Sequence, residues 1–163
     1  VDILRRAGLT CDIISVTGEQ ALTSSHRVTV LADVLYEDAD FDSYDALAIP
    51  GGMPGTINLG EHAGVCEQLQ RACAQGKLIA AICAAPTVFG KLGLLQGKKA
   101  ICFPGMEDQL TGAEVTCEPV VRDGNIITSR GMGTAIDFGL AILSYFEDEA
   151  TVEALAKKIV YHA

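Results

Sequence analysis

The stretch KLIAAICAAP at residues 77–86 decides how this chain folds. Its first half is a short run of Leu, Ile and Ala, a pattern typical of a strand that is buried on both faces. Small residues follow, and Pro86 stands where the first turn of a helix tolerates a residue that has no N–H group. Residues 77–91 are therefore predicted to form a strand and a helix, with Cys83 at the corner between them.

The position of Cys83 suggests a reactive thiol. A thiol at such a corner lies near unpaired backbone N–H groups and near the positive end of the helix dipole, and both favour the thiolate. Small neighbours permit the tight turn, as in the nucleophile elbow of hydrolases. Free cysteines also commonly fill space in a core. The local sequence leaves both interpretations of Cys83 open, a nucleophile and a core residue.

Size and composition predict one compact domain over residues 1–163, since 49% of the residues are apolar and 20% are charged. The formal net charge is −9, and the neighbouring basic residues at 5–6 and 98–99 are isolated pairs. Nucleic acid is therefore not an expected partner, because phosphate binding needs clustered Lys and Arg. A membrane is not expected either, because no apolar run is long enough to span one and the chain opens without a signal-peptide pattern.

Cysteine and histidine usage bears on the redox compartment and on metal binding. None of the six cysteines belongs to a Cys-x-x-Cys pair. Three disulfides in a secreted protein are one interpretation, but a chain with a core of this size does not need them, so free thiols in a reducing cytoplasm are expected. The three histidines, at 26, 62 and 162, have no ligand spacing to a cysteine. Neither a metal nor a cofactor is predicted.

Periodicity and turn residues predict the remaining elements. Helices are expected over residues 1–8, 61–75, 131–146 and 150–161. Strands are expected over residues 9–16, 28–31, 44–49, 100–103, 115–121 and 125–129, with a hairpin turn at Arg122-Asp123-Gly124. The helical residues expected to face inward are Val65, Leu69, Ala72, Ile136, Leu140, Leu143, Val152, Leu155 and Ile159. The first helix reads as the end of a longer one, so further residues are expected upstream of Val1.

Alternation of strands and helices predicts an α/β fold with a mostly parallel sheet and helices on both sides. Ligands of such sheets bind beyond the carboxyl ends of the strands. Pro50-Gly51-Gly52 and Cys83 both follow a predicted strand, so they are expected to meet at one site. The Gly52 and Ala84 N–H groups would then form an oxyanion hole. A simple tight turn is the other interpretation of the glycine pair.

Three segments in this order resemble the DJ-one/ThiJ/PfpI superfamily, and most closely its DJ-one branch. They are ALAIPGG at 46–52, IAAICAAP at 79–86 and TSRGMGTA at 128–135. Residues 1–8 are also similar to the first helix of that branch. The resemblance extends over nearly the whole chain.

The resemblance implies a flavodoxin-like three-layer α/β/α sandwich, a homodimer, and Cys83 as nucleophile with the Gly52 and Ala84 N–H groups as oxyanion donors. It implies a cofactor-independent, glyoxalase-type or deglycase-type activity on small carbonyls such as methylglyoxal or their early glycation adducts. The alternative is an oxidative-stress sensor or chaperone that works through oxidation of Cys83. A structural relative without activity is a third interpretation.

Two departures from the family pattern concern proton transfer. The family's first strand, and the glutamate that follows it, belong upstream of Val1. Phe103-Pro104 stands where many members have His-Pro. His26, Arg6 and Arg27 are the auxiliary candidates near a partner subunit's site, and ordinary surface residues are the alternative for each of them. His62 is expected to be solvated, and Cys102 and Cys117 to be core or strand residues.

Overall fold

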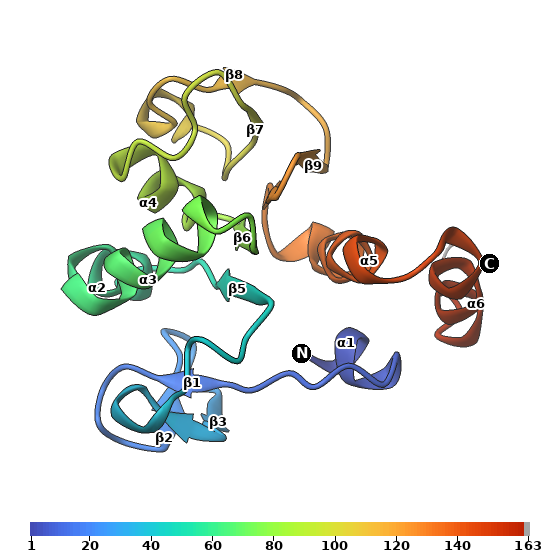
Figure 1. Ribbon diagram of the computed structural model, residues 1–163, viewed down its shortest axis with the longest axis horizontal. Helices are drawn as coiled ribbons and strands as arrows, with labels where there is room; N and C mark the ends of the chain where they lie inside the picture. Colours follow the sequence, from blue (N-terminus) through green and yellow to red (C-terminus); the bar gives the residue numbers. More distant parts are fainter. Residues whose placement is uncertain (162–163) are drawn as a thin grey trace.

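A four-stranded sheet forms the centre of the protein, which is described over residues 1–161 by a computed structural model (Figure 1). The strands lie in the order β5 (Ala46–Ile49), β6 (Leu78–Ile82), β10 (Ile126–Ser129) and β9 (Val120–Asp123). The first three run parallel, and β9 pairs antiparallel with β10 through the predicted hairpin. Helices flank this mostly parallel sheet, which confirms the flavodoxin-like α/β fold. Residues 162 and 163 lie outside the described residues, and His162, one of the three histidines named above, is among them.

Shorter elements complete the described chain. The other helices and strands are α1 (Asp2–Arg6), β1 (Ile14–Ser15), β2 (Ala21–Thr23), β3 (Thr29–Leu31), β4 (Val34–Leu35), α2 (Gly55–Glu61), α3 (Ala63–Ala74), α4 (Pro86–Lys91), β7 (Lys99–Ala100), β8 (Glu114–Val115), α5 (Ala135–Phe146) and α6 (Glu149–Lys158). The short 3-10 helices are η1 (Tyr36–Asp38), η2 (Glu107–Gln109) and η3 (Met132–Thr134). β1 pairs with β4, β2 with β3, and β7 with β8.

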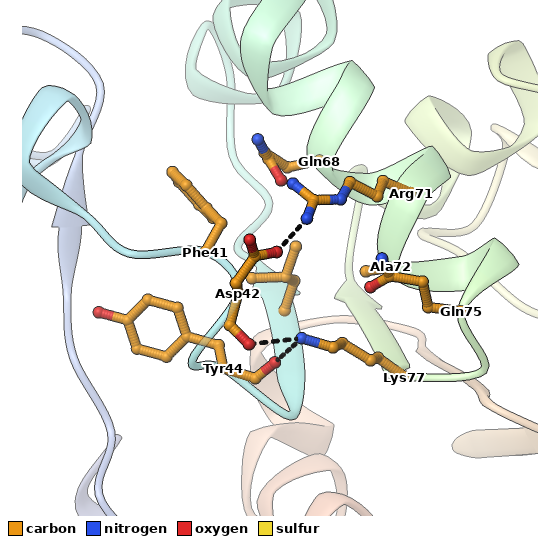
Figure 2. Close-up of a pocket in the computed structure, with 9 residues that line it drawn as sticks. Phe41, Asp42, Tyr44, Gln68, Arg71, Ala72, Gln75 and Lys77 are labelled. Carbon is orange, nitrogen blue, oxygen red and sulfur yellow. Dashed lines mark hydrogen bonds and ion pairs between the residues drawn. The ribbon is translucent and has the colours of Figure 1, made fainter.

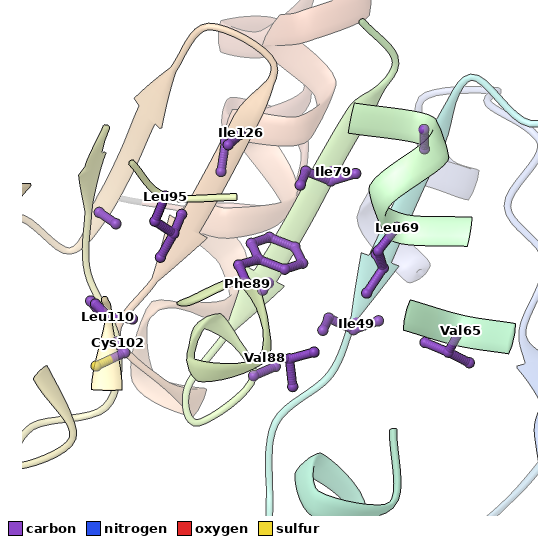
Figure 3. Packing of buried hydrophobic residues seen from close by; sticks show 14 residues of the cluster. Ile49, Val65, Leu69, Ile79, Val88, Phe89, Leu95, Cys102, Leu110 and Ile126 are labelled. Carbon is purple, nitrogen blue, oxygen red and sulfur yellow. The ribbon is translucent and has the colours of Figure 1, made fainter. Parts of the chain in front are cut away.

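Strand β6 divides the core into two layers because successive side chains of a strand point to opposite faces. Ile79 and Ala81 belong to the larger cluster with α3 and α4. Phe89 lies in this cluster and is completely buried (Figure 3). Leu78 and Ala80 belong to a smaller cluster with Ile127 and with Ile142 of α5. These four β6 residues are fully buried, as the apolar run predicted.

Strand 9–16 is shorter than predicted, since only Ile14–Ser15 pairs as a strand. Side chains satisfy backbone groups of the preceding residues instead. The Arg5 guanidinium donates to the Cys11 carbonyl at 2.6 and 2.9 Å, and the Asp33 carboxylate accepts from the Ile13 N–H at 2.8 Å. Polar backbone groups need a partner but not necessarily another strand, so the ladder does not extend here.

The predicted helix 61–75 is confirmed as α3, which begins two residues later than predicted, and the preceding α2 was not predicted. His62 adopts an extended conformation between them, and its Nδ1 accepts from the Val65 N–H at 3.1 Å as an N-cap. Its ring stacks on Tyr36 at 4.7 Å between centroids. The expectation of a solvated His62 is therefore wrong. The inward positions Val65, Leu69 and Ala72 are confirmed as buried.

Other predicted boundaries and burials also change. Strand 100–103 is reduced to β7, because Ile101 N–H donates to the Thr128 hydroxyl and Phe103 N–H to the Cys83 carbonyl. Segment 115–121 is divided between β8 and β9. Ile136 is exposed, since the buried face of α5 is made by Ile142 and Leu143. Ala48 in β5 is exposed as well, because β5 is an edge strand of its sheet among the described residues.

Candidate active site

Cys83 occupies a strained turn between β6 and α4. Its φ of 65° is in the left-handed region that L-residues rarely adopt. Its N–H donates to the Ser129 carbonyl at 2.9 Å, and its carbonyl accepts from the Phe103 N–H at 2.7 Å. Two segments far apart in sequence therefore hold the turn. Strain of this kind, about 1–3 kcal/mol, is typically found at functional sites.

The Pro50-Gly51-Gly52 turn presses directly against this elbow. A Cβ at Gly51 would lie 2.5 Å from the Cys83 Cβ, 2.6 Å from the Ile82 carbonyl oxygen and 3.0 Å from the Ala84 nitrogen. Only glycine fits at position 51, because any side chain would collide with these atoms. Gly52 has φ 92° and open space around a Cβ position, so its backbone conformation favours glycine. The prediction that the two strand ends meet is confirmed.

The elbow leaves two backbone donors without an acceptor. Neither the Gly52 N–H nor the Ala84 N–H donates a hydrogen bond to residues 1–161, whereas the next amide, Ala85 N–H, donates to the Ile82 carbonyl at 3.1 Å. Two such donors beside a thiol have the composition of an oxyanion hole. The arrangement can therefore receive a carbonyl whose oxygen becomes negative on attack.

Three apolar residues are exposed on the loops that adjoin the Cys83 elbow. Phe103, whose N–H donates to the Cys83 carbonyl, is 47% exposed. Its ring lies 3.6 Å from the position that a Cβ of Gly131 would occupy. Met53 follows Gly52 and is 46% exposed, and Met132 follows Gly131 and is 90% exposed. Phe103 contributes no acid or base where the family pattern often has a histidine.

The other cysteines differ from Cys83 in their environment. All six are free thiols, as predicted. Cys102 is buried, and burial raises the pKa of its thiol to about 11, with smaller contributions from Glu107 and Asp108. Cys117 is exposed and lies between β8 and β9, so its expected place in the core or in a strand is wrong. Cys83 is half-buried and is the cysteine at the carboxyl end of the central strand.

The three auxiliary candidates make other contacts. Arg6 pairs with Asp2 on α1 at 2.7 Å. His26 and Arg27 lie in the turn of the β2–β3 hairpin, where His26 Nδ1 is 3.2 Å from the Ser25 hydroxyl and Arg27 N–H donates to the Ser24 carbonyl. None of these contacts involves the Cys83 elbow. A role for these side chains would have to be exerted at another subunit.

A small hollow between α3 and the loop before β5 is filled by the side chains that line it. Arg71 pairs with the Asp42 carboxylate, and Lys77 Nζ donates to the carbonyl oxygens of Asp42 and Tyr44 at 2.9 and 2.8 Å (Figure 2). Its volume is only about 10 Å³, roughly that needed for one water. The ion pair and the two hydrogen bonds tie α3 and the residues after it to the loop before β5, and they leave no room for a substrate.

Across residues 1–161, no three His, Cys, Asp or Glu side chains are grouped so that they could hold a metal ion. No helix in that range has the length and hydropathy needed to cross a membrane.

A sequence profile of the DJ-1/PfpI family matches residues 1–145. The chain belongs to the DJ-1/PfpI family. Protein dj-1beta of Drosophila melanogaster is 38% identical over 161 residues, which cover 98% of this chain and 86% of that protein. This member also superimposes on oxidized Toxoplasma gondii DJ-1 with a TM-score of 0.94 and 37% identity, covering 99% of this chain and 89% of the other.

A third relative carries an activity in its name. The deglycase PYRAB04690 of Pyrococcus abyssi is 35% identical over 115 residues, which cover 69% of this chain and 68% of that protein. In the present chain, the sequence predicted the Cys83 corner and the glycine turn, but it did not predict helix α2.

Proposed function

We propose that this member of the DJ-1/PfpI family is a cysteine-dependent, cofactor-independent enzyme of glyoxalase or deglycase type. Its substrates would be small reactive carbonyls such as methylglyoxal, or their early glycation adducts. The observation that carries the proposal is the strained Cys83 turn with Gly51 packed against it and two free N–H donors beside it. The archaeal relative named as a deglycase supports the same chemistry.

The proposed reaction begins with attack of the Cys83 sulfur on the aldehyde carbon. A C–S bond forms, the C=O π pair moves onto oxygen, and the Gly52 and Ala84 N–H groups stabilise that oxyanion. A base then moves a proton from the former aldehyde carbon to its neighbour, and water displaces the sulfur to release the hydroxy acid. In the family pattern described above, the base is a glutamate that precedes the first helix.

The test compares methylglyoxal consumption and lactate formation by the wild-type protein, Cys83→Ala and Cys117→Ala. Cys117→Ala is the matched control because it removes an exposed thiol from another part of the chain. We expect Cys83→Ala to abolish turnover and Cys117→Ala to retain it. Equal rates for wild type and Cys83→Ala would refute the proposal.

A redox sensor is the second candidate, favoured by the half-exposed Cys83 thiol and by the oxidized state named for the Toxoplasma relative. One peroxide would convert the thiolate to a sulfenate with release of water, and a second would give the sulfinate. Mild peroxide treatment followed by peptide mass mapping distinguishes the two functions. A selective two-oxygen adduct on Cys83 without methylglyoxal turnover would favour the sensor.

We also propose a cytoplasmic homodimer. Free thiols persist in a reducing compartment, and the β2–β3 hairpin exposes the apolar residues Val28, Val30 and Leu31. A second copy covering this hairpin would also bring His26 and Arg27 toward a neighbouring subunit. Sedimentation of the wild type and of Val30→Asp tests the dimer, which the charged substitution should dissociate.

A further inference from the structure

Arg130 follows strand β10 and stands beside Cys83 at the carboxyl edge of the sheet. Strands β10 and β6 pair in parallel with Ser129 opposite Ile82, so Arg130 and Cys83 are the next residues along the two strands. The peptide group between Ser129 and Arg130 is held on both sides. Its carbonyl accepts from the Cys83 N–H at 2.9 Å, and its N–H donates to the Pro119 carbonyl at 3.1 Å. The Arg130 backbone is therefore fixed one strand spacing, roughly 4.8 Å, from the residue that carries the thiol.

The Arg130 guanidinium has no partner in the described chain. The residue is exposed, and its side chain makes no hydrogen bond, ion pair or ring contact with residues 1–161. Carboxylates are abundant, since the chain has 21 Asp and Glu but only 12 Lys and Arg. Four other arginines do contact an acidic or aromatic side chain: Arg5 pairs with Asp33, Arg6 with Asp2 and Arg71 with Asp42, and Arg122 lies over the Tyr145 ring. The Arg130 guanidinium is therefore available to an anion from solution.

Cys83 lies between two groups that can bind different parts of a carbonyl compound. Strand β6 is flanked by β5 on one side and by β10 on the other. The Gly51-Gly52 turn follows β5, and the Gly52 N–H is free to bind a carbonyl oxygen. Arg130 follows β10 on the opposite side. A substrate whose oxygen lies at Gly52 and whose carbon lies at the thiol can therefore extend its other end toward the long Arg130 side chain.

We propose that Arg130 recognises a carboxylate on the carbonyl compound that Cys83 attacks, which rests on the function proposed above and names its substrate class. Preferred substrates are then oxo-aldehydes, or their early adducts, that carry a carboxylate. A guanidinium presents a planar fork that matches the two oxygens of a carboxylate, and such charge-assisted hydrogen bonds are stronger than neutral ones. The net charge of −9 repels anions at long range, so an anionic substrate needs a local cation of this kind. Arg130 takes no part in the bond changes and acts as a specificity-determining residue.

The experiment compares alkylation of Cys83 by iodoacetate and by iodoacetamide, followed by peptide mapping. The two reagents have nearly the same size and the same leaving group, but only iodoacetate carries a carboxylate. In both reactions the Cys83 sulfur bonds to the CH₂ carbon, and iodide leaves with the electron pair of the C–I bond. Because both reagents consume the same thiolate, the ratio of the two rates is independent of how much thiolate is present. We expect Arg130→Gln to lower the iodoacetate-to-iodoacetamide ratio by roughly two- to fivefold, as for an exposed ion pair.

Two further variants separate a specific contact from a change in net charge. Arg130→Lys keeps the charge but not the planar fork, so its ratio should lie between those of wild type and Arg130→Gln. Lys158→Gln is the matched control, because it removes an exposed cation at the end of α6, which Figure 1 shows at the far right, away from β6. It should leave the ratio unchanged. Arg130→Gln should unfold at the wild-type temperature, since the guanidinium makes no contact to lose within residues 1–161.

An unchanged ratio in Arg130→Gln, or an equal fall of the ratio in Lys158→Gln, would overturn the inference. Alkylation needs no turnover, so this measurement reports on Arg130 even if Cys83 proves to have no glyoxalase or deglycase activity. Conversely, methylglyoxal has no carboxylate, so its turnover by wild type and its loss in Cys83→Ala would support the proposed function whatever the outcome at Arg130. The two proposals can therefore fail separately.

Discussion

Gly51→Ala tests whether the elbow depends on the contact between the two strand ends. A methyl group at this position would lie 2.5 Å from the Cys83 Cβ, whereas ordinary contacts begin at 3.4 Å. Two of the three atoms it meets are backbone atoms of Ile82 and Ala84, which cannot rotate away. The ends of β5 and β6 must therefore move apart by most of an ångström.

Overpacking of this kind costs about 1–3 kcal/mol, and we expect the upper end because the obstacle is backbone. For a chain of this size, about 3 kcal/mol corresponds to a decrease in Tm of roughly 6–12 °C. Thermal and urea denaturation measure the loss of stability. The rate of Cys83 alkylation by iodoacetamide, read by peptide mapping, reports whether the turn has changed.

Gly55→Ala is the matched control, because the same methyl group four residues later in the chain meets nothing within 4 Å. It should be neutral or stabilising by up to about 1 kcal/mol, since alanine favours helix more than glycine does. If Gly51→Ala unfolds within about 0.5 kcal/mol of wild type and its Cys83 reacts at the wild-type rate, the reasoning is refuted.

Two other predictions concern stability. Phe89→Ala should lower the free energy of unfolding by about 3–5 kcal/mol, because it empties the centre of the larger cluster. Phe146→Ala should lower it much less, because Phe146 is 39% exposed. Equal losses in urea denaturation would contradict this. The Lys99 N–H and then Lys98 Nζ hold the pKa of Asp123 below 3.8. The ionised Asp123 carboxylate stabilises the folded protein above the unfolded pKa, and this stabilisation is lost as pH falls through the folded pKa. Asp123→Asn should therefore lower the free energy of unfolding near neutral pH and make it less sensitive to acid. Parallel urea curves for both proteins at every pH would contradict this.

Elements encoded by neighbouring residues could be predicted from sequence. The unbroken apolar run of β6 has the pattern of a central strand, and Pro86 marks the start of α4. The turn at Asp123-Gly124 joins β9 to β10 as expected. Each of these signals lies within a few residues and needs no knowledge of the rest of the chain.

Elements that depend on distant partners could not be predicted in this way. The strand expected over residues 9–16 is short because Arg5 and Asp33 bind its backbone. The helix expected over residues 61–75 begins only at Ala63, because His62 caps α3 and packs on Tyr36. Periodicity describes only one segment at a time, so it does not register such competing hydrogen bonds.

The candidate site shows the same division. The residue types around Cys83 and the order of the three segments in the chain identify the elbow and its glycine turn. Only the tertiary structure shows why each glycine is needed. At Gly51 any side chain would collide with the elbow, because the packed strand ends bring the Cys83 Cβ within 2.5 Å of a Gly51 Cβ position. At Gly52 the positive φ favours glycine. The tertiary structure also decides which amides stay unpaired, since this depends on atoms that are distant in sequence and adjacent only after folding.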